Sequence, residues 1–482
     1  MTNYLQRIYR DSLGLLTDLY ELTMAYGYWK QGLAERQAVF QLFFRKRPFG
    51  GSYAVCAGME VALEFIRAFH FSKEDLAYLE SLHLFEKGFL DYLGALKIEL
   101  DIDAVPEGTT IFPYEPLIRV KGPLLQAQIM ESALLNIINF QTLVATKASR
   151  VCWAARPDQV VEFGLRRAQG IDGAIAASRA AYVGGCHSTS HVLAGKLFNI
   201  PVMGTHAHSW VMAYKREEEA FRAFAEVFPQ NCIFLIDTYD TLEGARHAVE
   251  VGKEFRAQGV ELQGVRLDSG DLATLSSEVR QILDEGGFPK AQIMASNELD
   301  ESIISDLKHQ GSRITIWGVG TNLVTARDQP ALDGVYKLSA IEDETGEWRY
   351  CLKVSDQVIK TTHPGISQVR RYFDGRGAVA DMLYDERIPL TARPHIINHT
   401  DASATRDVKE NWTFRDLLVP MLRKGQSVYV SPSLKEIREK TYRELEQFDP
   451  AIRRFLNPSP FFAGTEQQLY NLKLKMIHEI KD

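Results

Sequence analysis

The middle third of the chain alternates short apolar runs with amphipathic segments, and this alternation constrains the fold more than any other feature. The apolar runs have strand length, the segments between them have helical periodicity, and the strand-to-strand period is roughly 20 to 40 residues. Such a succession is typical of a βα barrel or a doubly wound sheet. Fewer than eight clear strands favours an α/β fold with an irregular, incomplete βα barrel, and an open sheet remains an alternative. The strand-like runs are 160–163, 200–204, 233–237, 264–268, 292–296 and 314–318, and the helix-like stretches include 217–227, 242–257, 272–283 and 298–309.

The two flanks lack the strand–helix alternation of the middle third, because turn signals and not helical segments separate their apolar runs. β-leaning segments lie before the barrel, at 39–44 and 117–120, and after it, at 336–341 and 369–373. We predict one β-rich domain built from both flanks, with an early helix and a C-terminal helical tail that opens at a Ser433-x-x-Glu436 capping box. The predicted divisions are 1–135 (N-terminal β-rich part), 136–340 (catalytic barrel), 341–430 (return to the β-rich domain) and 431–482 (helical tail).

Composition excludes several classes of protein. The net charge of −7 gives no electrostatic reason to expect a nucleic-acid partner. No run approaches the roughly 20 apolar residues that span a bilayer, and the first residues do not form a secretory signal. We therefore expect a cytoplasmic protein. The five cysteines are scattered singly, which argues against a disulfide framework and against a cysteine zinc site.

Polar or glycine-rich residues follow nearly every predicted strand of the middle third. In a βα barrel the carboxyl ends of the strands meet at one face, where the catalytic groups cluster. The sequence therefore predicts one shared active site at this face. The segments at the strand ends are 163–167, 205–208, 237–240, 266–271, 296–297 and 318–321.

Two imidazoles, His206 and His208, follow the second of these strands. Imidazole can act as base, nucleophile or metal ligand at neutral pH, so the chemistry is expected to depend on His208. Two histidines two residues apart also share a face of an extended segment, as in a metal site. The later strand ends offer no further histidine, which argues against a metal site formed by His206 and His208. A structural role for His208 stays open, and His206 reads as a bystander.

Other strand ends suggest an anionic ligand. Arg266 and Asp268 share one face of their strand, and a charged pair inside a barrel needs a ligand or counter-ion. The glycine-rich segment 318–321 suits a phosphate, although a tight turn explains it equally well. Arg166 could clamp a phosphate or a carboxylate, or lie in solvent.

Seven blocks together resemble the nicotinate phosphoribosyltransferase family, which has the type II phosphoribosyltransferase fold. Each block alone is weak, but their order along most of the chain is specific. They are GLLTDLYELTMA at 14–25, EFGLRRAQG at 162–170, GTHAHS at 204–209, RLDSGD at 266–271, GVGT at 318–321, GVYKL at 334–338 and PG at 364–365.

The resemblance implies an ATP-dependent, ligase-type synthesis of nicotinate mononucleotide from nicotinate and phosphoribosyl pyrophosphate, in NAD salvage, with magnesium. His208 matches the family histidine that takes a phosphate from ATP, so it is the expected phosphohistidine. Asp237 and Asp268 are then the expected partners of His208 and the holders of magnesium or ribose. The resemblance also implies a homodimer whose sites straddle the interface.

The same resemblance assigns the substrate contacts. The nicotinate ring is expected between Phe163 and Tyr20, the latter from the neighbouring subunit, while Arg266 and Thr205 meet the ring or its carboxylate. The residues expected at the phosphate and ribose are Arg166, Gly318, Gly320, Thr321 and, as a weaker candidate, Thr362.

Two departures from the family pattern stand out. His206 occupies a variable position of its motif, and no cysteine follows Cys351, so we expect no structural zinc. Three alternatives stay open: a metal-dependent barrel hydrolase using His206 and His208, a non-catalytic ligand-binding protein, and a preference for nicotinamide or quinolinate over nicotinate.

Overall fold

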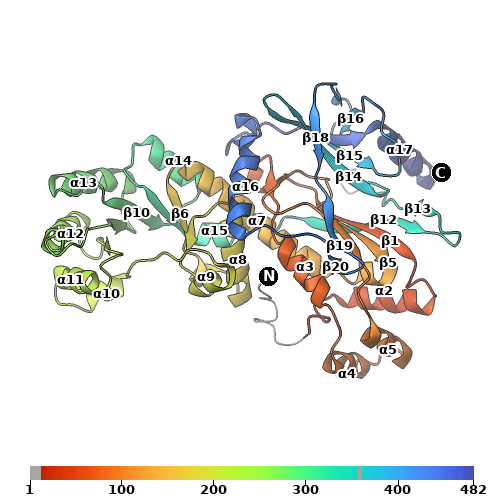
Figure 1. Cartoon of the computed structure of the whole chain (residues 1–482), viewed down its shortest axis with the longest axis horizontal. Coiled ribbons are helices and arrows are strands. Elements are labelled where there is room, and N and C mark those ends of the chain that lie inside the picture. The colour runs from red at the N-terminus through yellow and green to blue at the C-terminus, as the bar shows by residue number, and fades with distance from the viewer. Residues whose placement is uncertain (1–11, 356–360, 482) are drawn as a thin grey trace. The chain divides into compact units, whose positions relative to one another are not determined.

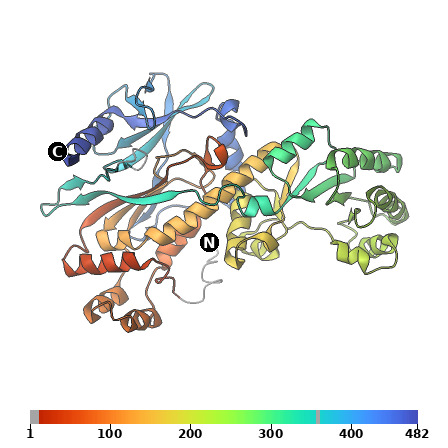
Figure 2. The same cartoon turned by 180° about the vertical axis from the view of Figure 1, so that it is seen from behind.

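The computed structural model describes residues 12–355 and 361–481, and the chain divides into two compact units. Unit 1 comprises Met1–Thr146 and Ala331–Asp482, and unit 2 comprises Lys147–Pro330. Figure 1 and Figure 2 show both units from opposite sides. Each is an assembly of helices and strands with its own sheets, so the fold class is α/β as predicted.

Unit 2 is built on a parallel sheet of six strands in the order β7-β6-β11-β10-β9-β8. The register places Ser296 beside Gly318 and Leu235 beside Arg266, so the polar carboxyl ends of neighbouring strands align at one edge. The strand bounds are β6 (Gln159–Glu162), β7 (Ser188–Thr189), β8 (Ile233–Leu235), β9 (Gly264–Leu267), β10 (Gln292–Asn297) and β11 (Ile316–Val319).

Aspartates that follow the strands start three of the helices of unit 2. Asp240, Asp271 and Asp300 each accept two backbone N–H bonds at the first turn of α12, α13 and α14. These caps explain why carboxylates recur after the strands without a catalytic role for each. The helices are α8 (Ile171–Val183), α9 (Val192–Phe198), α10 (His208–Met212), α11 (Glu217–Val227), α12 (Thr241–Arg256), α13 (Leu272–Glu285), α14 (Glu301–His309) and α15 (Thr321–Val324).

The predicted strand at 200–204 is reduced to a single bridge between Val202 and Thr189. Thr189 donates to the carbonyl of Pro201, and Met203 donates to the carbonyl of Thr189, both at 3.0 Å. Pro201 has no N–H to extend the ladder, which is one reason why the pairing stays short. The prediction of an irregular, incomplete barrel rested on counting fewer than eight strands, and it stays a prediction.

Unit 1 contains two larger sheets and the pair β2-β4. In the seven-stranded sheet, β13-β12-β1-β5-β3-β19-β20, the N-terminal strand β1 pairs with β12 on one side and with β5 on the other. The bounds in this sheet are β1 (Gln37–Phe44), β3 (Asp101–Ala104), β5 (Ile118–Pro123), β12 (Gly334–Glu342), β13 (Trp348–Tyr350), β19 (Val419–Arg423) and β20 (Gln426–Ser427), and the pair is β2 (Ala54–Val55) with β4 (Thr110–Ile111).

The six-stranded sheet of unit 1 has the order β17-β16-β21-β15-β14-β18. Its core contains Tyr372, Met382 and Ile396, on three different strands. Figure 2 shows α17 beside this sheet, close to the C-terminus. The bounds are β14 (Ser367–Asp374), β15 (Gly377–Asp385), β16 (His395–Asn398), β17 (Thr405–Asp407), β18 (Thr413–Asp416) and β21 (Ala463–Glu466).

The helices of unit 1 include the predicted early helix, which runs as α2 from Leu19 to Lys30. The predicted capping box of Ser433 and Glu436 starts α16 (Leu434–Glu446), and the chain continues to α17 (Gln467–Lys481). In the part of the chain that the structure describes, none of the helices has the length and apolar character that crossing a bilayer requires. The remaining helices are α3 (Met59–Ala68), α4 (Lys73–Ser81), α5 (Lys87–Ala95), α6 (Leu124–Gln128) and α7 (Glu131–Ala155), which contains the boundary between the units.

Candidate active site

Arg266 is the centre of a hydrogen-bond network at the carboxyl edge of the parallel sheet. Its guanidinium donates to Ser296 Oγ at 2.8 Å, to Thr205 Oγ1 at 3.1 Å and to Asp268 Oδ1 at 3.1 Å. It also lies 5.5 Å from the centre of the Phe163 ring. Its side chain is only 12% exposed, yet its carboxylate partner Asp268 is 32% exposed. The network therefore fixes the arginine while leaving its surroundings open to a ligand.

The two predicted carboxylates, Asp237 and Asp268, are joined through the backbone. Asp237 Oδ2 accepts from the N–H of Asp268 at 3.0 Å and from the hydroxyl of Ser269 at 2.6 Å. Burial opposes ionisation of Asp268, but a hydrogen bond from Ser296 and the charge of Arg266 outweigh it, so its pKa is lowered. Asp268 is therefore a carboxylate at neutral pH.

Asp237 and Asp268 also suit a hard cation. The other oxygen of Asp237, Oδ1, is buried and has no hydrogen-bond partner among the described residues. A buried carboxylate oxygen without a donor is costly unless a cation or water meets it. Magnesium is commonly held by one or two carboxylates together with substrate phosphates. Within 12–355 and 361–481 the structure has no cluster of three or more metal-ligating side chains.

His208 begins α10 and places its ring between two of these strand ends. Its Nδ1 lies 3.2 Å from Thr238 Oγ1, and its Nε2 lies 3.7 Å from Asp268 Oδ2. The side chain is 41% exposed. The imidazole therefore lies beside a hydroxyl and a carboxylate, while its remaining surface is accessible to a ligand.

His206 is held quite differently, although it lies two residues from His208. It is 8% exposed, and its Nε2 accepts a hydrogen bond from the N–H of Leu235 at 3.2 Å. Its ring packs edge to face against Phe224 at 4.9 Å. Burial lowers the pKa of His206 to about 4, so it is neutral at pH 7. With its Nε2 lone pair engaged, His206 does not form a metal-binding pair with His208.

His206 and Asn231 link the segment before His208 to β8. Asn231 Nδ2 donates to the carbonyl of Gly204 at 3.0 Å, and the N–H of Leu235 in β8 donates to His206. Side chains therefore take the place of a strand ladder at this edge. The sequence set His206 apart from the expected catalyst His208, and the structure adds that His206 links this segment to β8.

Glycines keep the ring of Phe163 in place against the sheet. A Cβ at Gly318 would lie 2.7 Å from the Phe163 ring, and one at Gly320 would lie 3.1 Å from the Phe163 carbonyl oxygen. Any side chain at Gly318 would displace the ring. The GVGT segment is therefore explained at least in part by packing, and its predicted phosphate contacts remain a prediction.

The remaining predicted phosphate residues of unit 2 are Gly320 and Thr321, within this glycine segment, and Arg166, in the turn after β6. Gly320 precedes the short helix α15, which begins at Thr321. Arg166 lies in the 3-10 turn Leu165–Arg167, is exposed, and has no hydrogen bond to another described residue. Both positions are accessible to a ligand, and nothing in the structure assigns them one.

Tyr20 and Thr362, the other two predicted site residues, belong to unit 1. Tyr20 lies in α2, is 45% exposed, and has its pKa raised by burial and by the carboxylates of Glu131 and Glu21. Thr362 is buried, and its hydroxyl accepts a hydrogen bond from the N–H of Lys353 at 3.1 Å. That backbone bond explains the hydroxyl of Thr362 without a phosphate.

Three site-building residues were not assigned a role from the sequence. Ser296 bonds both Arg266 and Asp268, and Thr238 meets His208. Glu162 is completely buried and accepts from Ser178 and Thr189 and from the N–H of Gly164. Their positions at strand ends were a signal, but most of their partners lie far away in the sequence, on other strands, helices or loops.

The comparisons with known proteins agree in pointing to one family. Its models match three parts of the chain: the nicotinate phosphoribosyltransferase N-terminal domain at 15–139, the family model at 159–375 and the C-terminal domain at 367–473. A nicotinate phosphoribosyltransferase of Bacillus subtilis is 42% identical over 476 residues, which cover 98% of this chain and 96% of that protein.

Solved structures agree with the sequence matches. The crystal structure of human nicotinic acid phosphoribosyltransferase superimposes with a TM-score of 0.84 at 31% identity, covering 95% of this chain and 99% of that one. A nicotinate-nucleotide pyrophosphorylase from Pyrococcus furiosus shares the fold at a TM-score of 0.68 and 24% identity, covering 90% and 95%. The chain belongs to the nicotinate phosphoribosyltransferase family.

Proposed function

We propose that this protein makes nicotinate mononucleotide from nicotinate and phosphoribosyl pyrophosphate in NAD salvage, and that ATP drives the reaction through a phosphohistidine at His208. The observation that carries the proposal is the placement of the His208 ring between Thr238 and Asp268, with its remaining surface exposed. Family membership supports the overall reaction, and the site supports the role of the histidine.

The carboxylate of Asp268 faces Nε2 of His208 and stabilises a proton there, which leaves the lone pair on Nδ1. Nδ1 gives up its hydrogen bond with Thr238 and attacks the γ-phosphorus of ATP; an N–P bond forms, the β–γ P–O bond breaks, and ADP leaves. Water later cleaves the N–P bond and releases phosphate. Adding a phosphoryl group changes charge and hydrogen bonding beside the substrate, which couples ATP cleavage to binding and release.

Nicotinate is a flat ring with a carboxylate, and Phe163 and Arg266 offer a matching pair. The Phe163 ring supplies a stacking face, while the guanidinium of Arg266 pairs with the carboxylate and Thr205 supplies a hydroxyl. Transfer of the ribose passes through an oxocarbenium-like state, for which the protein's contribution is positioning and charge. Asp237 and Asp268 would hold magnesium, which neutralises pyrophosphate charge when bound.

The test is product formation from phosphoribosyl pyrophosphate and each of nicotinate, nicotinamide and quinolinate, with magnesium, with and without ATP. We expect nicotinate mononucleotide from wild-type protein, ATP stimulation, and loss of that stimulation in His208→Ala. The control is His309→Ala, which removes an exposed imidazole of the same unit. If nicotinamide or quinolinate gives a product and nicotinate gives none, the proposed substrate is wrong. If His208→Ala keeps full ATP stimulation, the proposed phosphohistidine is wrong.

The family resemblance also implies a homodimer in which Tyr20 reaches the partner's site, and a complementation experiment tests this part. Tyr20→Ala and His208→Ala proteins are each weakly active on this proposal. Refolding them together creates mixed dimers with one site that has both residues. Recovery of ATP-stimulated activity supports a shared site, whereas a mixture no better than its parts means that each chain supplies its own tyrosine.

A further inference from the structure

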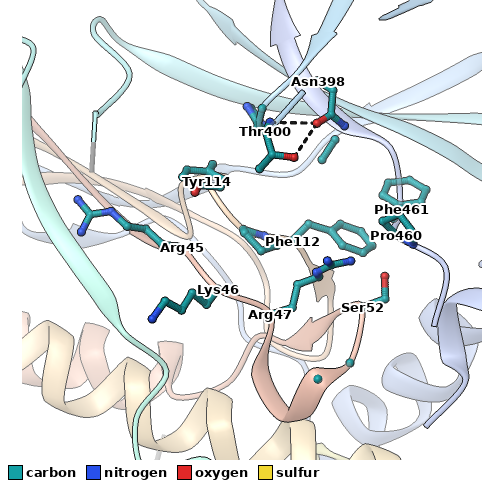
Figure 3. A pocket seen from close by; sticks show the side chains of 15 residues that line it. Arg45, Lys46, Arg47, Ser52, Phe112, Tyr114, Asn398, Thr400, Pro460 and Phe461 are labelled. Carbon is teal, nitrogen blue, oxygen red and sulfur yellow. Dashed lines mark hydrogen bonds between the residues drawn. The ribbon is translucent and has the colours of Figure 1, made fainter. Parts of the chain in front are cut away.

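Two adjoining cavities in unit 1 are lined by cations, imidazoles and aromatic rings. The first has a volume of about 430 Å³ and the second about 480 Å³, within the range of small-molecule sites. They share Tyr114, Asn398, His399 and Thr400, so they form one continuous hollow. Figure 3 shows the first cavity. None of the residues assigned to the active site lines either cavity.

The charge of this lining is of one sign. Arg45, Lys46, Arg47, Lys473 and Lys481 contribute to the two cavities, and the described lining residues include no aspartate or glutamate. The chain as a whole carries a net charge of −7, so a lining of this sign departs from the overall balance. A hollow with cations and no carboxylate concentrates positive potential and attracts anions.

Lys473 is the cation that most needs a partner. It lies in α17, and burial lowers the pKa of its amine to about 8. No ion pair or hydrogen bond joins it to another residue within the described parts of the chain. A desolvated ammonium without a counter-ion costs free energy, and an anionic ligand would remove that cost.

Two imidazoles beside Lys473 also have polar atoms without partners. His363 is 7% exposed, and its Nδ1 forms no hydrogen bond with the described residues. His399 uses Nδ1 for Thr465 Oγ1, at 3.1 Å, while its buried Nε2 likewise lacks a described partner. The two rings lie 5.2 Å apart, edge to face. Burial lowers the pKa of both, so each is neutral and keeps one N–H to donate.

The other end of the hollow suits an aromatic group. Figure 3 shows Arg47 extending toward the rings of Phe112 and Phe461, which stack on each other at 4.4 Å. Asn398 and Thr400 lie across the cavity, where Asn398 Oδ1 accepts two hydrogen bonds from Thr400 at 3.0 Å. Those bonds use the carbonyl side of the Asn398 amide and orient its nitrogen as a donor.

We propose that this hollow is a second ligand site, which binds a phosphorylated small molecule of the nucleotide class. Lys473 pairs with the phosphate, His363 and His399 donate hydrogen bonds to it, and the aromatic rings hold the base. This proposal uses residues of unit 1 alone and does not depend on the proposed function of the parallel-sheet edge.

The test is calorimetric titration of the full-length protein with adenosine 5′-monophosphate, adenosine and inorganic phosphate. We expect adenosine 5′-monophosphate to bind most tightly and Lys473→Met to weaken it at least about tenfold, the scale of one charge-assisted hydrogen bond. The matched control is Lys475→Met on the same helix, where the lysine is exposed and lies 3.7 Å from Glu479. Its affinity should equal that of the wild type.

Each alternative has its own outcome. Equal binding by wild type and Lys473→Met would place the nucleotide at the active site and overturn the proposal, as would adenosine binding as tightly as its monophosphate. Thermal unfolding without ligand separates a structural lysine from a ligand-binding one. Removal of an unpaired, partly buried charge leaves the melting temperature unchanged or higher, whereas a clear decrease would mean that Lys473 stabilises the fold.

Discussion

Arg266 in unit 2 and Arg371 in unit 1 have similar partners and different surroundings. Each is paired with an aspartate and lies near a phenylalanine ring. Arg371 is completely buried, donates twice to Asp381 at 2.8 and 2.6 Å, and also bonds the carbonyl of Thr110. Arg266 pairs with an aspartate that is 32% exposed. The same pairing is therefore closed to solvent at Arg371, whereas at Arg266 one partner stays accessible, as the proposed binding of nicotinate requires.

Breaking the sealed pair should have the largest effect. In Arg371→Met, Asp381 and Glu444 would remain buried without their cation. We expect the free energy of unfolding to fall by about 3–5 kcal/mol, measured by urea unfolding, with normal activity for each folded molecule. Arg376→Met, which removes a 92% exposed arginine, is the control and should change stability by less than about 0.5 kcal/mol.

The buried, neutral imidazole of His206 should make the free energy of unfolding depend on pH. The pKa of His206 is about 4 when folded and about 6.5 when unfolded, so the unfolded chain binds more protons between these values. Stability is therefore fully present above pH 6.5 and is lost as the pH falls toward 4, by at most about 3 kcal/mol. His206→Gln keeps an acceptor for Leu235 and does not titrate.

The check for His206 is the difference between the unfolding free energies of the wild type and His206→Gln across pH 4 to 7. Carboxylates titrate in both proteins and cancel in that difference. If the two curves run parallel through this window, His206 is not buried in the neutral form.

Removing Arg266 from its ion pair with Asp268 should affect ligand binding more than folding. In Arg266→Met we expect kcat/KM for nicotinate to fall about 100-fold, equivalent to about 2.7 kcal/mol, with an unfolding free energy within about 1 kcal/mol of wild type. Arg266→Lys keeps the positive charge but loses the paired N–H donors of the guanidinium. Its activity should therefore lie between that of the wild type and that of Arg266→Met. A stability loss as large as that of Arg371→Met would remove the distinction between the two arginines.

The smallest effect is expected at the glycine under Phe163. Gly318→Ala forces the ring to shift, since the new Cβ would lie 2.7 Å from it, and should cost about 1–2 kcal/mol of stability. We also expect a higher KM for nicotinate, measured by steady-state kinetics. Gly173→Ala in α8 has open space around its Cβ and should leave both quantities unchanged or improve stability slightly.

The sequence predicted features that depend on neighbouring residues, and it did not predict contacts between distant ones. The strands β6 and β8 to β11, the helices between them and the capping box at Ser433 follow from periodicity and capping residues that are neighbours in sequence. The bonds of Ser296 depend on the register of β10 against β9, and the contact of Thr238 depends on the position of α10, neither of which a local pattern specifies.

The cavity in unit 1 was beyond sequence reasoning for the same reason. Arg47 and Lys473 are separated by more than 400 residues, and nothing near either of them marks a shared hollow. The roles of His208 and Asp268 were predicted because their motifs resemble a family, whereas their mutual placement came from the structure.

The link between the segment at Gly204 and β8 makes the position of His208 sensitive to substitution in this chain. Backbone ladders form with almost any side chain, so substitutions rarely alter them. Here Asn231 and His206 make the connection, and two substitutions would be enough to loosen or retune it. The position of the segment that carries His208 therefore depends on these two side chains and not on a backbone ladder.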